Sequence, residues 1–345
     1  MSGQDWPSVS VVIPTYNRSD VVERTLRCLA AQDYPADKLE VLVVDNSSDD
    51  TPQMTRRVAA EVDITIRLLE RPERMPATKR NIGVREATGE LVLFMNDDLW
   101  LVPEAVREHA VAHRARGDQP VAVLGRTIQS PQMEQTPFIE AYEPFAYFEL
   151  GREPRRDLRW WYCWSMNLSL PREVMLARNL VFHTDWREIG SEDVELGWRW
   201  TQAGYPLDYA PAAWGEHFHP HSLDSASRLQ ASIGRGVRDL EALVDDPDLL
   251  ERWGIFDWRN SPRSVARSLI RMVLFNDVTV PPVTRWLNGR TSNNAASRWL
   301  WWKVLLHHTN KGYRATSPRR PVPTPTLPVA ESTAEAASSG VRGPA

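Results

Sequence analysis

Residues 9–18 read VSVVIPTYNR, and they indicate the fold because a β-branched apolar run ends there at a proline and polar residues come next. A short apolar run without polar alternation predicts a strand that is buried on both faces, as in a parallel sheet. The next residues, about 20–32, carry apolar side chains at helical spacing and predict a helix packed on that strand. A strand followed by a covering helix is the repeating unit of α/β folds.

The same unit recurs through the first 130 residues. Further apolar runs predict buried strands at 40–45 (EVLVVD), 64–69, 91–95 and 121–125. Helix start signals stand between them, at 48–52 and at Pro103. We therefore predict an α/β fold with a mostly parallel sheet and helices on both faces. Beyond it, the sequence predicts strands at 165–170 and 206–210 and helices from about 191, over 223–244 and over 262–310.

Charge divides the chain near residue 250. Residues 1–251 carry 27 basic and 41 acidic side chains, a balance of −14, whereas residues 252–320 carry 13 basic and 2 acidic ones, a balance of +11. A reversal of this kind indicates a change of role. We predict that 251–314 form a basic, Trp-rich helical extension, and that 315–345, dominated by prolines and small residues, are a disordered tail.

Carboxylates follow two of the predicted strands. Asp45 ends one strand, and Asn96, Asp97 and Asp98 follow another. Ligands of parallel sheets bind beyond the carboxyl ends of the strands. Adjacent buried carboxylates repel each other unless a cation or a hydroxyl offsets their charge, and Mg²⁺ or Mn²⁺ prefers such oxygen ligands. The structural alternative for Asp97 and Asp98 is a helix cap. For Asp45 the structural alternative is an Asx turn, and the functional interpretation is that its carboxylate accepts a hydrogen bond from a nucleotide base.

Cations stand just before the strand at 91–95. The segment RMPATKRNIG, residues 74–83, contains Arg74, Lys79 and Arg80. A guanidinium or ammonium at this place suits contact with a phosphate or a base. A solvated helix face is the alternative.

Two carboxylates, Glu192 and Asp193, follow Ser191 at the start of the helix predicted from GSEDVELGWRW, residues 190–200. The helix dipole favours carboxylates in a first turn, which explains them structurally. A carboxylate held at a buried helix start is also a candidate general base. Both interpretations stay open on spacing alone.

Three histidines alternate in EHFHPH, residues 216–221, directly after a predicted strand. In an extended segment they would share one side. Neither thiols nor a helical histidine pair accompanies them, so zinc is not expected.

Four segments in order resemble the successive motifs of family 2 glycosyltransferases: VSVVIPTYNR, VLVVDNSSDDT, KRNIGVREATGELVLFMNDD and GSEDVELGWRWTQAG. The resemblance spans about 9–221 and leaves 222–345 without a match. It implies a GT-A fold, in which 1–130 form the nucleotide-sugar-binding half and 131–250 the half that binds the acceptor and supplies the catalytic base.

The resemblance also implies roles for single residues. Asp45 would bind the nucleotide base, with Pro14, Thr15 and Tyr16 lining its pocket, while Asp97 would contact the ribose. Asp98 would hold a divalent metal, Mn²⁺ or Mg²⁺, with His217 as a further ligand; His219 competes with His217 for that role. Asp193, beside Glu192, would be the general base. Asn96 stands where the family's acidic triplet often begins with Asp, so the metal would rely on the last two positions.

The expected reaction is a single displacement that inverts the anomeric carbon and transfers a sugar from a nucleotide-diphosphate donor to an acceptor hydroxyl. A UDP-sugar is the expected donor, with an N-acetylhexosamine as first guess, and the acceptor is a glycan, a lipid-linked sugar or a small molecule. Aromatic faces stack on sugar rings, so Trp160, Trp161 and Trp164 are predicted to contact the acceptor or the sugar. The turn that follows them, Ser165, Met166 and Asn167, is a candidate for contacting the donor sugar. A hydrophobic core is the alternative for each tryptophan.

The sequence lacks the motifs that two other classes of enzyme normally carry. A nucleotidyltransferase normally carries a glycine-rich loop after its first strand, and a dinucleotide-dependent oxidoreductase carries G-x-G-x-x-G; PTYNRSD, residues 14–20, has no glycine. A protein that binds a nucleotide sugar without turnover is the other alternative. No nucleic-acid partner is expected. Two cysteines and an N-terminus without a signal-peptide pattern predict a cytoplasmic protein.

The extension allows three interpretations. Residues 262–275 place Val265, Leu269, Met272 and Val273 on one helical stripe, and 298–306 (RWLWWKVLL) combine tryptophans with cations. We favour packing of these helices on the acidic catalytic region. A homodimer contact through 262–310, or peripheral attachment to the inner face of a membrane, is the alternative.

Overall fold

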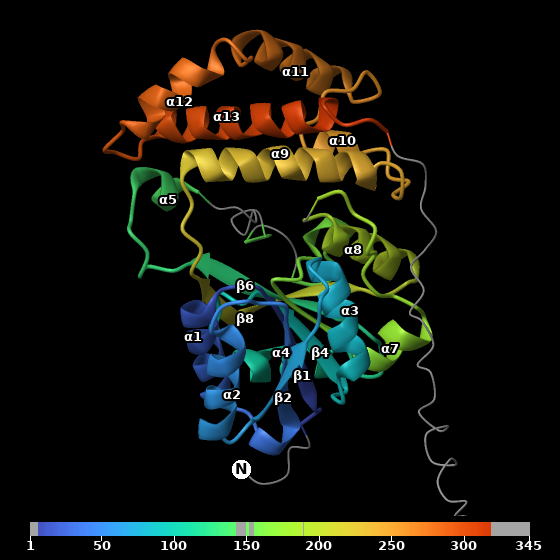
Figure 1. Ribbon diagram of the computed structural model, residues 1–345. Coiled ribbons are helices and arrows are strands. Elements are labelled where there is room, and N and C mark those ends of the chain that lie inside the picture. The colour runs from blue at the N-terminus through green and yellow to red at the C-terminus, as the bar shows by residue number, and fades with distance from the viewer. Residues whose placement is uncertain (1–5, 143–149, 152–154, 189, 319–345) are drawn as a thin grey trace, which may run out of the picture.

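The computed structural model describes residues 6–142, 150–151, 155–188 and 190–318. Most of the predicted tail, 319–345, lies outside the described residues. Figure 1 shows an α/β body at the bottom and a layer of helices across its top. Among the described residues, no helix is both long enough and apolar enough to cross a membrane.

One eight-stranded sheet forms the body, in the order β3-β2-β1-β4-β7-β6-β8-β5. Its strands are β1 (Val9–Thr15), β2 (Leu39–Asp45), β3 (Thr65–Glu70), β4 (Leu91–Met95), β5 (Leu99–Leu101), β6 (Ala122–Gln129), β7 (Asn167–Pro171) and β8 (Leu207–His217). The first four neighbours run parallel, and β6 runs parallel to β8, whereas β7 and β5 are antiparallel to their neighbours. The α/β fold with a mostly parallel sheet is confirmed.

Helices cover both faces of the sheet, as predicted. On one face Val11 and Ile13 of β1 pack among residues of α1 (Ser19–Ala30), α2 (Thr51–Glu61) and α4 (Ala105–Arg114). On the other face Val12 packs among residues of α3 (Pro76–Glu86) and α8 (Glu192–Gln202). Successive strand residues point to opposite faces, so a continuous apolar strand such as β1 supplies two cores at once.

The strands differ from expectation near the site. β5 was not predicted, because three residues are too few to show a period. β8 was predicted at 206–210 but runs on to His217, and it passes a bulge opposite Gly125 and Arg126 of β6. Pairing with β6 on one side and with β5 on the other keeps β8 extended as far as His217.

The remaining helices form the upper layer and its connections, except for α7 (Arg172–Ala177), which lies beside the sheet directly after β7. The others are α5 (Pro137–Ala141), α9 (Leu223–Leu240), α10 (Leu249–Arg252), α11 (Pro262–Leu274), α12 (Val280–Asn288) and α13 (Ala295–Arg314). In Figure 1, α9 lies nearest the sheet, α13 lies on α9, and α11 with α12 lies outermost. An apolar cluster joins α5, α9, α12 and α13 through residues such as Phe138, Leu223, Leu287 and Trp301.

Candidate active site

Asp98 is the centre of a cluster at the carboxyl end of β4. Its carboxylate lies 2.9 Å from Nη2 of Arg18, 3.1 Å from Nε2 of His217 and 2.9 Å from Nδ1 of His219. Strand pairing brings the histidines to Asp98. Leu99 of β5 is the register partner of His217, and the amide of Phe218 donates to the carbonyl of Asp98. His217 is buried, and the side chain of His219 is partly exposed.

The donor set fits a divalent cation. Asp98, His217 and His219 each offer a ligand atom, and these atoms all lie within 4.8 Å of one another. Oδ1 of Asp98 is buried, and its neighbour in this cluster is Nε2 of His217 at 3.1 Å. Burial alone would raise the pKa of Asp98, but His217, His219 and Arg18 outweigh it and hold the pKa well below its usual range, so the group is a carboxylate at neutral pH. One carboxylate with two imidazoles is a ligand set that first-row divalent metals accept.

Asp97 faces the first strand instead. Its Oδ2 accepts a 2.7 Å hydrogen bond from the hydroxyl of Thr15, and its Oδ1 lies 3.4 Å from Arg18. Burial and the charge of Asp98 raise the pKa of Asp97 to about 6. The hydroxyl of Thr25 in α1 donates to the Asp97 carbonyl and fixes the turn after β4.

Asp45 ends β2 opposite Thr15, its register partner in β1. The backbone amide and hydroxyl of Ser47 donate to Oδ1 of Asp45, which forms the Asx turn that the sequence allowed. Oδ2 of the same carboxylate is buried and accepts no hydrogen bond. The turn therefore uses half of this carboxylate and leaves the other oxygen for a ligand. Beside it, Tyr16 is exposed and Pro14 is half-buried.

The cationic side chains of residues 74–83 differ in burial and in their hydrogen-bond partners. Arg74 is exposed in the loop before α3. Lys79 is buried, and its Nζ donates to the Thr15 carbonyl and to Oδ1 of Asn46 at 2.6 Å, so it joins β1 to the turn after β2. Arg80 is also buried; its Nη1 lies 3.2 Å from Oε1 of Glu192, and its Nη2 donates to Asn96.

Glu192 and Asp193 have different surroundings at the start of α8. The backbone amides of Gly190 and Ser191 donate to Oε2 of Glu192, and Arg80 holds the other oxygen, so this carboxylate is fully engaged. Asp193 is half-buried and accepts at Oδ2 from the amide of Ser165 at 3.0 Å and from its hydroxyl at 3.1 Å. Burial and the neighbouring Glu192 raise the pKa of Asp193 to about 6. A carboxylate with that pKa can take up a proton near neutral pH.

Two links connect Asp193 to the cluster around Asp98. Arg80 bridges Glu192 to Asn96, two residues before Asp98. Ser165 holds Asp193, and the carbonyl of the next residue, Met166, accepts from the amide of Asn96. The candidate ligand cluster around Asp98 and the carboxylate of Asp193 are therefore joined by a short chain of hydrogen bonds.

The predicted sugar-contacting residues are not all brought to this site. Asn167 is fully buried, and its amide bonds His109, the Arg126 carbonyl and the Ala213 carbonyl, so every group it offers is used inside the sheet. Trp160 is buried, and its indole N–H donates to Asp246. The core interpretation therefore holds for Trp160, whereas Trp161 and Trp164 keep part of their surface exposed.

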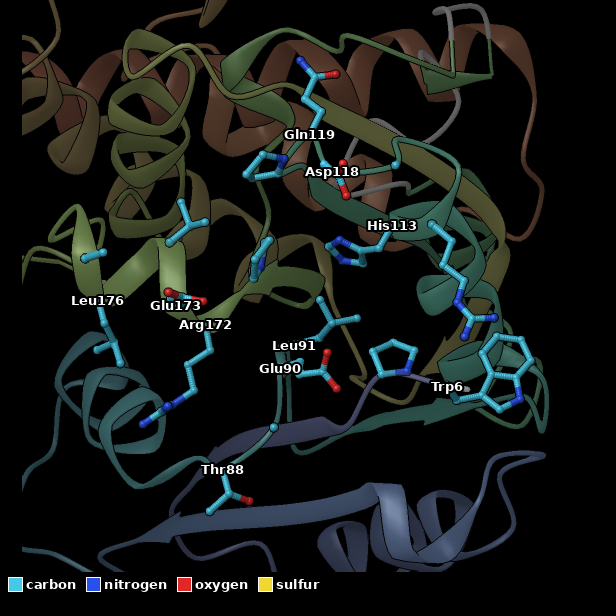
Figure 2. A pocket seen from close by; sticks show the side chains of 18 residues that line it. Trp6, Thr88, Glu90, Leu91, His113, Asp118, Gln119, Arg172, Glu173 and Leu176 are labelled. Atoms are coloured by element: carbon cyan, nitrogen blue, oxygen red, sulfur yellow. The ribbon is translucent and has the colours of Figure 1, made fainter. Parts of the chain in front are cut away.

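Arg18 is a site residue that the sequence analysis missed. It ends the opening motif, and a cation directly after the first strand was the available signal. Ser165 was expected to contact the donor sugar, and only the fold places it against Asp193. An open hollow of about 850 Å³ near Trp6, Glu90 and Arg172, shown in Figure 2, contains none of the predicted site residues and takes no part in this site.

Comparison with known proteins identifies the family of this chain. Residues 10–169 match the model of the family described as Glycosyl transferase family 2. Glycosyltransferase AglE of Haloferax volcanii is 36% identical over 240 residues, which cover 67% of this chain and 73% of that protein. This chain belongs to glycosyltransferase family 2.

Two further glycosyltransferases are longer or more distant in sequence. Validoxylamine A glucosyltransferase of Streptomyces hygroscopicus subsp. jinggangensis is 30% identical over 271 residues, which cover 70% of this chain and 63% of that enzyme. The chain thus spans less than two thirds of that relative. A mannosyltransferase from Pyrobaculum calidifontis, solved with GDP-Man and Mn²⁺, has the same fold, with a TM-score of 0.62 at 20% identity over 90% of this chain and 87% of that one.

Proposed function

We propose that this chain is an inverting, metal-dependent glycosyltransferase that moves a sugar from a nucleotide-diphosphate donor to an acceptor hydroxyl. The observation that carries the proposal is the joining of two groups at one sheet edge: the ligand cluster of Asp98, His217 and His219, and the carboxylate Asp193 with its raised pKa. The mannosyltransferase with the same fold, solved with GDP-Man and Mn²⁺, supports the metal and the donor class.

The donor nucleotide binds along the ends of β1, β2 and β4. Asp45 accepts from the base with its free oxygen, between Pro14, Thr15 and Tyr16, and Asp97 contacts the ribose. Arg74, exposed in the loop before α3, is assigned to the donor as well, and Arg80 acts on the site through Glu192 and Asn96. A UDP-sugar is the donor class that we favour, and UDP-N-acetylhexosamine is the first candidate within it.

Asp98 would hold the cation, with His217 or His219 as the second protein ligand. When bound, Mn²⁺ or Mg²⁺ neutralises the charge that develops on the leaving diphosphate. Arg18 lies against Asp98 and adds a positive charge at the same place.

Asp193 removes the proton from the acceptor hydroxyl, and that oxygen attacks the anomeric carbon as the bond to the diphosphate breaks on the opposite face. Ser165 orients the carboxylate through two hydrogen bonds, and Arg80 neutralises Glu192, so Asp193 takes the proton alone. One displacement without a covalent intermediate inverts the configuration. Trp161 and Trp164 border the place where a glycan, a lipid-linked sugar or a small molecule would lie as acceptor.

The test is a panel of nucleotide sugars, including UDP-glucose, UDP-N-acetylglucosamine and GDP-mannose, with release of the nucleoside diphosphate as the readout. We expect turnover of one donor class with Mn²⁺ or Mg²⁺, none in excess EDTA, and none in Asp98→Ala. Asp118→Ala, an exposed acid outside the site, is the matched control. Full activity in EDTA would refute the metal role, and donor binding without turnover would identify a binding protein instead.

A further inference from the structure

Helix α11 buries two serines and leaves four of its aliphatic side chains exposed. The buried side chains of α11 are Ser264 and Ser268. On the opposite side, Leu269 is 40% exposed, Ile270 61%, Val273 74% and Leu274 54%. Of the predicted stripe, Leu269 and Val273 are exposed, whereas Val265 and Met272 are half-buried, so the stripe as a whole is not buried against the catalytic region as we had favoured. Buried apolar surface normally drives helix packing, so an outward stripe indicates a surface made for a partner.

The elements next to α11 in the helical layer also carry exposed apolar side chains. Val278 follows α11, Trp286 lies on α12, and Trp299 and Trp302 lie on α13, each at least half exposed. In Figure 1, α11 and α12 form the outermost part of the helical layer, on the side turned away from the sheet. We call these residues, together with those of α11, the outer face.

A cationic pocket opens in the outer face. It has a volume of about 320 Å³ and lies between α11 and α13. Arg267, Arg271 and Lys303 line it, and the exposed Ile270, Leu274 and Trp299 also border it. A pocket with cations inside and apolar side chains around it matches a phosphate that is attached to a hydrocarbon chain.

The pocket carries more positive than negative charge. Three cations, Arg267, Arg271 and Lys303, line it together with one carboxylate, Glu251. Among the described residues, none of these cations has a carboxylate within salt-bridge distance, and Glu251 accepts instead from the amide and hydroxyl of Ser261. Burial, Arg271 and Arg267 lower the pKa of Lys303, as expected where cations lie close together.

We propose that the outer face docks on an anionic phospholipid membrane, with a headgroup phosphate in the pocket between α11 and α13. The exposed tryptophans and aliphatic side chains enter the headgroup region, and the cations bind lipid phosphates. The balance of −14 on residues 1–251 is repelled by the same membrane and turns the basic layer toward it. A second copy fits less well, because a two-fold contact through this face would place the same cations against each other.

Co-sedimentation with vesicles tests the proposal. Full-length protein should bind vesicles of mixed phosphatidylcholine and phosphatidylglycerol at low salt, bind less at high salt, and not bind phosphatidylcholine alone. Each cation near the surface contributes about fivefold to affinity, so Arg267→Gln/Lys303→Gln should weaken binding by roughly 25-fold. Arg271 is left in place, because it also donates to the Gly254 carbonyl. Ile270→Ser/Val273→Ser should also weaken binding, and both side chains are too exposed for the change to disturb the core.

The matched control is Arg85→Gln/Arg178→Gln, which removes two exposed cations from α3 and from just after α7 and should bind like the unchanged protein. Absence of binding to anionic vesicles at low salt overturns the proposal, and so does equal binding by Arg267→Gln/Lys303→Gln and the control. Sedimentation velocity without lipid tests whether the outer face is instead a contact between two copies of the chain. If the unchanged chain is a dimer that Ile270→Ser/Val273→Ser converts to a monomer, the outer face is a self-association surface and the lipid proposal fails.

Discussion

Two adjacent carboxylates, Glu192 and Asp193, show how hydrogen-bond partners separate roles that the sequence leaves equal. Glu192 receives two backbone amides and the guanidinium of Arg80, so its charge is compensated. Asp193 lies beside that charge in a half-buried position, and its pKa is raised. A compensated carboxylate is a poor proton acceptor, whereas one with a raised pKa is a good one.

Asp193→Asn should lower kcat by roughly 10²–10⁴, because the amide keeps the volume but cannot accept a proton. Donor binding, measured by calorimetry with the nucleotide sugar and metal, should hardly change. Glu192→Gln is the companion variant and should retain more activity than Asp193→Asn. The opposite order of activities would assign the base to Glu192.

The pH dependence of kcat/KM should report the ionisation of Asp193. The base must be deprotonated and its pKa is raised to about 6, so the rate should fall about tenfold for each pH unit below that value. Ser165→Ala removes a hydrogen bond that lowers the pKa and should move the profile to higher pH, by on the order of one unit. Glu192→Gln removes a charge that raises the pKa and should move it to lower pH. Shifts of the same sign in both variants would contradict this assignment.

At the scale of elements, the packing of α13 on α9 depends on two glycines. A Cβ added at Gly312 in α13 would overlap the carbonyl oxygen of Ala231, and one added at Gly234 in α9 would overlap that of Thr309. The two backbones therefore touch where side chains would hold them apart. This close approach joins the C-terminal helices to α9, and α9 follows directly on the histidine segment after β8.

Gly312→Ala should lower the free energy of unfolding by about 1–3 kcal/mol, because the obstacle is backbone and the helices must separate. The higher helix propensity of alanine offsets only part of this cost. Gly289→Ala is the control, since its added Cβ would meet nothing nearer than 3.6 Å. Urea unfolding of both variants gives the comparison, and equal stability would show that the helices adjust without cost.

At the scale of the whole molecule, the proposed metal site joins segments that are distant in the chain. Arg18 follows β1, Asp98 follows β4, and His217 ends β8. A ligand that binds only this folded arrangement stabilises the entire protein by mass action.

Mn²⁺ should therefore raise the melting temperature of the chain, and EDTA should reverse the effect. At a hundredfold excess over Kd the gain is about 2.7 kcal/mol. Asp98→Asn should melt at the same temperature with and without Mn²⁺, whereas Asp118→Asn should respond like the unchanged protein. A full response in Asp98→Asn would place the metal elsewhere.

Local pattern was enough to predict the parallel half of the sheet and the carboxylates at its edge. Runs such as 9–14 and 40–45 are apolar throughout, so burial on both faces can be inferred without knowledge of their neighbours. Because parallel strands end at one edge, Asp45 and Asp98 had to lie on the same side of the molecule. Arg18 and β5 were not predicted, because a single cation and a three-residue strand show no periodic pattern.

Which partners each side chain meets depended on the packing of the whole chain. Pairing of β8 with β5 brought both His217 and His219 to Asp98, while Asn167 was taken by His109 and two carbonyls inside the sheet. Periodicity likewise showed that α11 has an apolar stripe but not which way the stripe points. The cause is the same in each case: a local pattern fixes the shape of a segment and the character of its faces, whereas the contacts of those faces depend on residues distant in sequence.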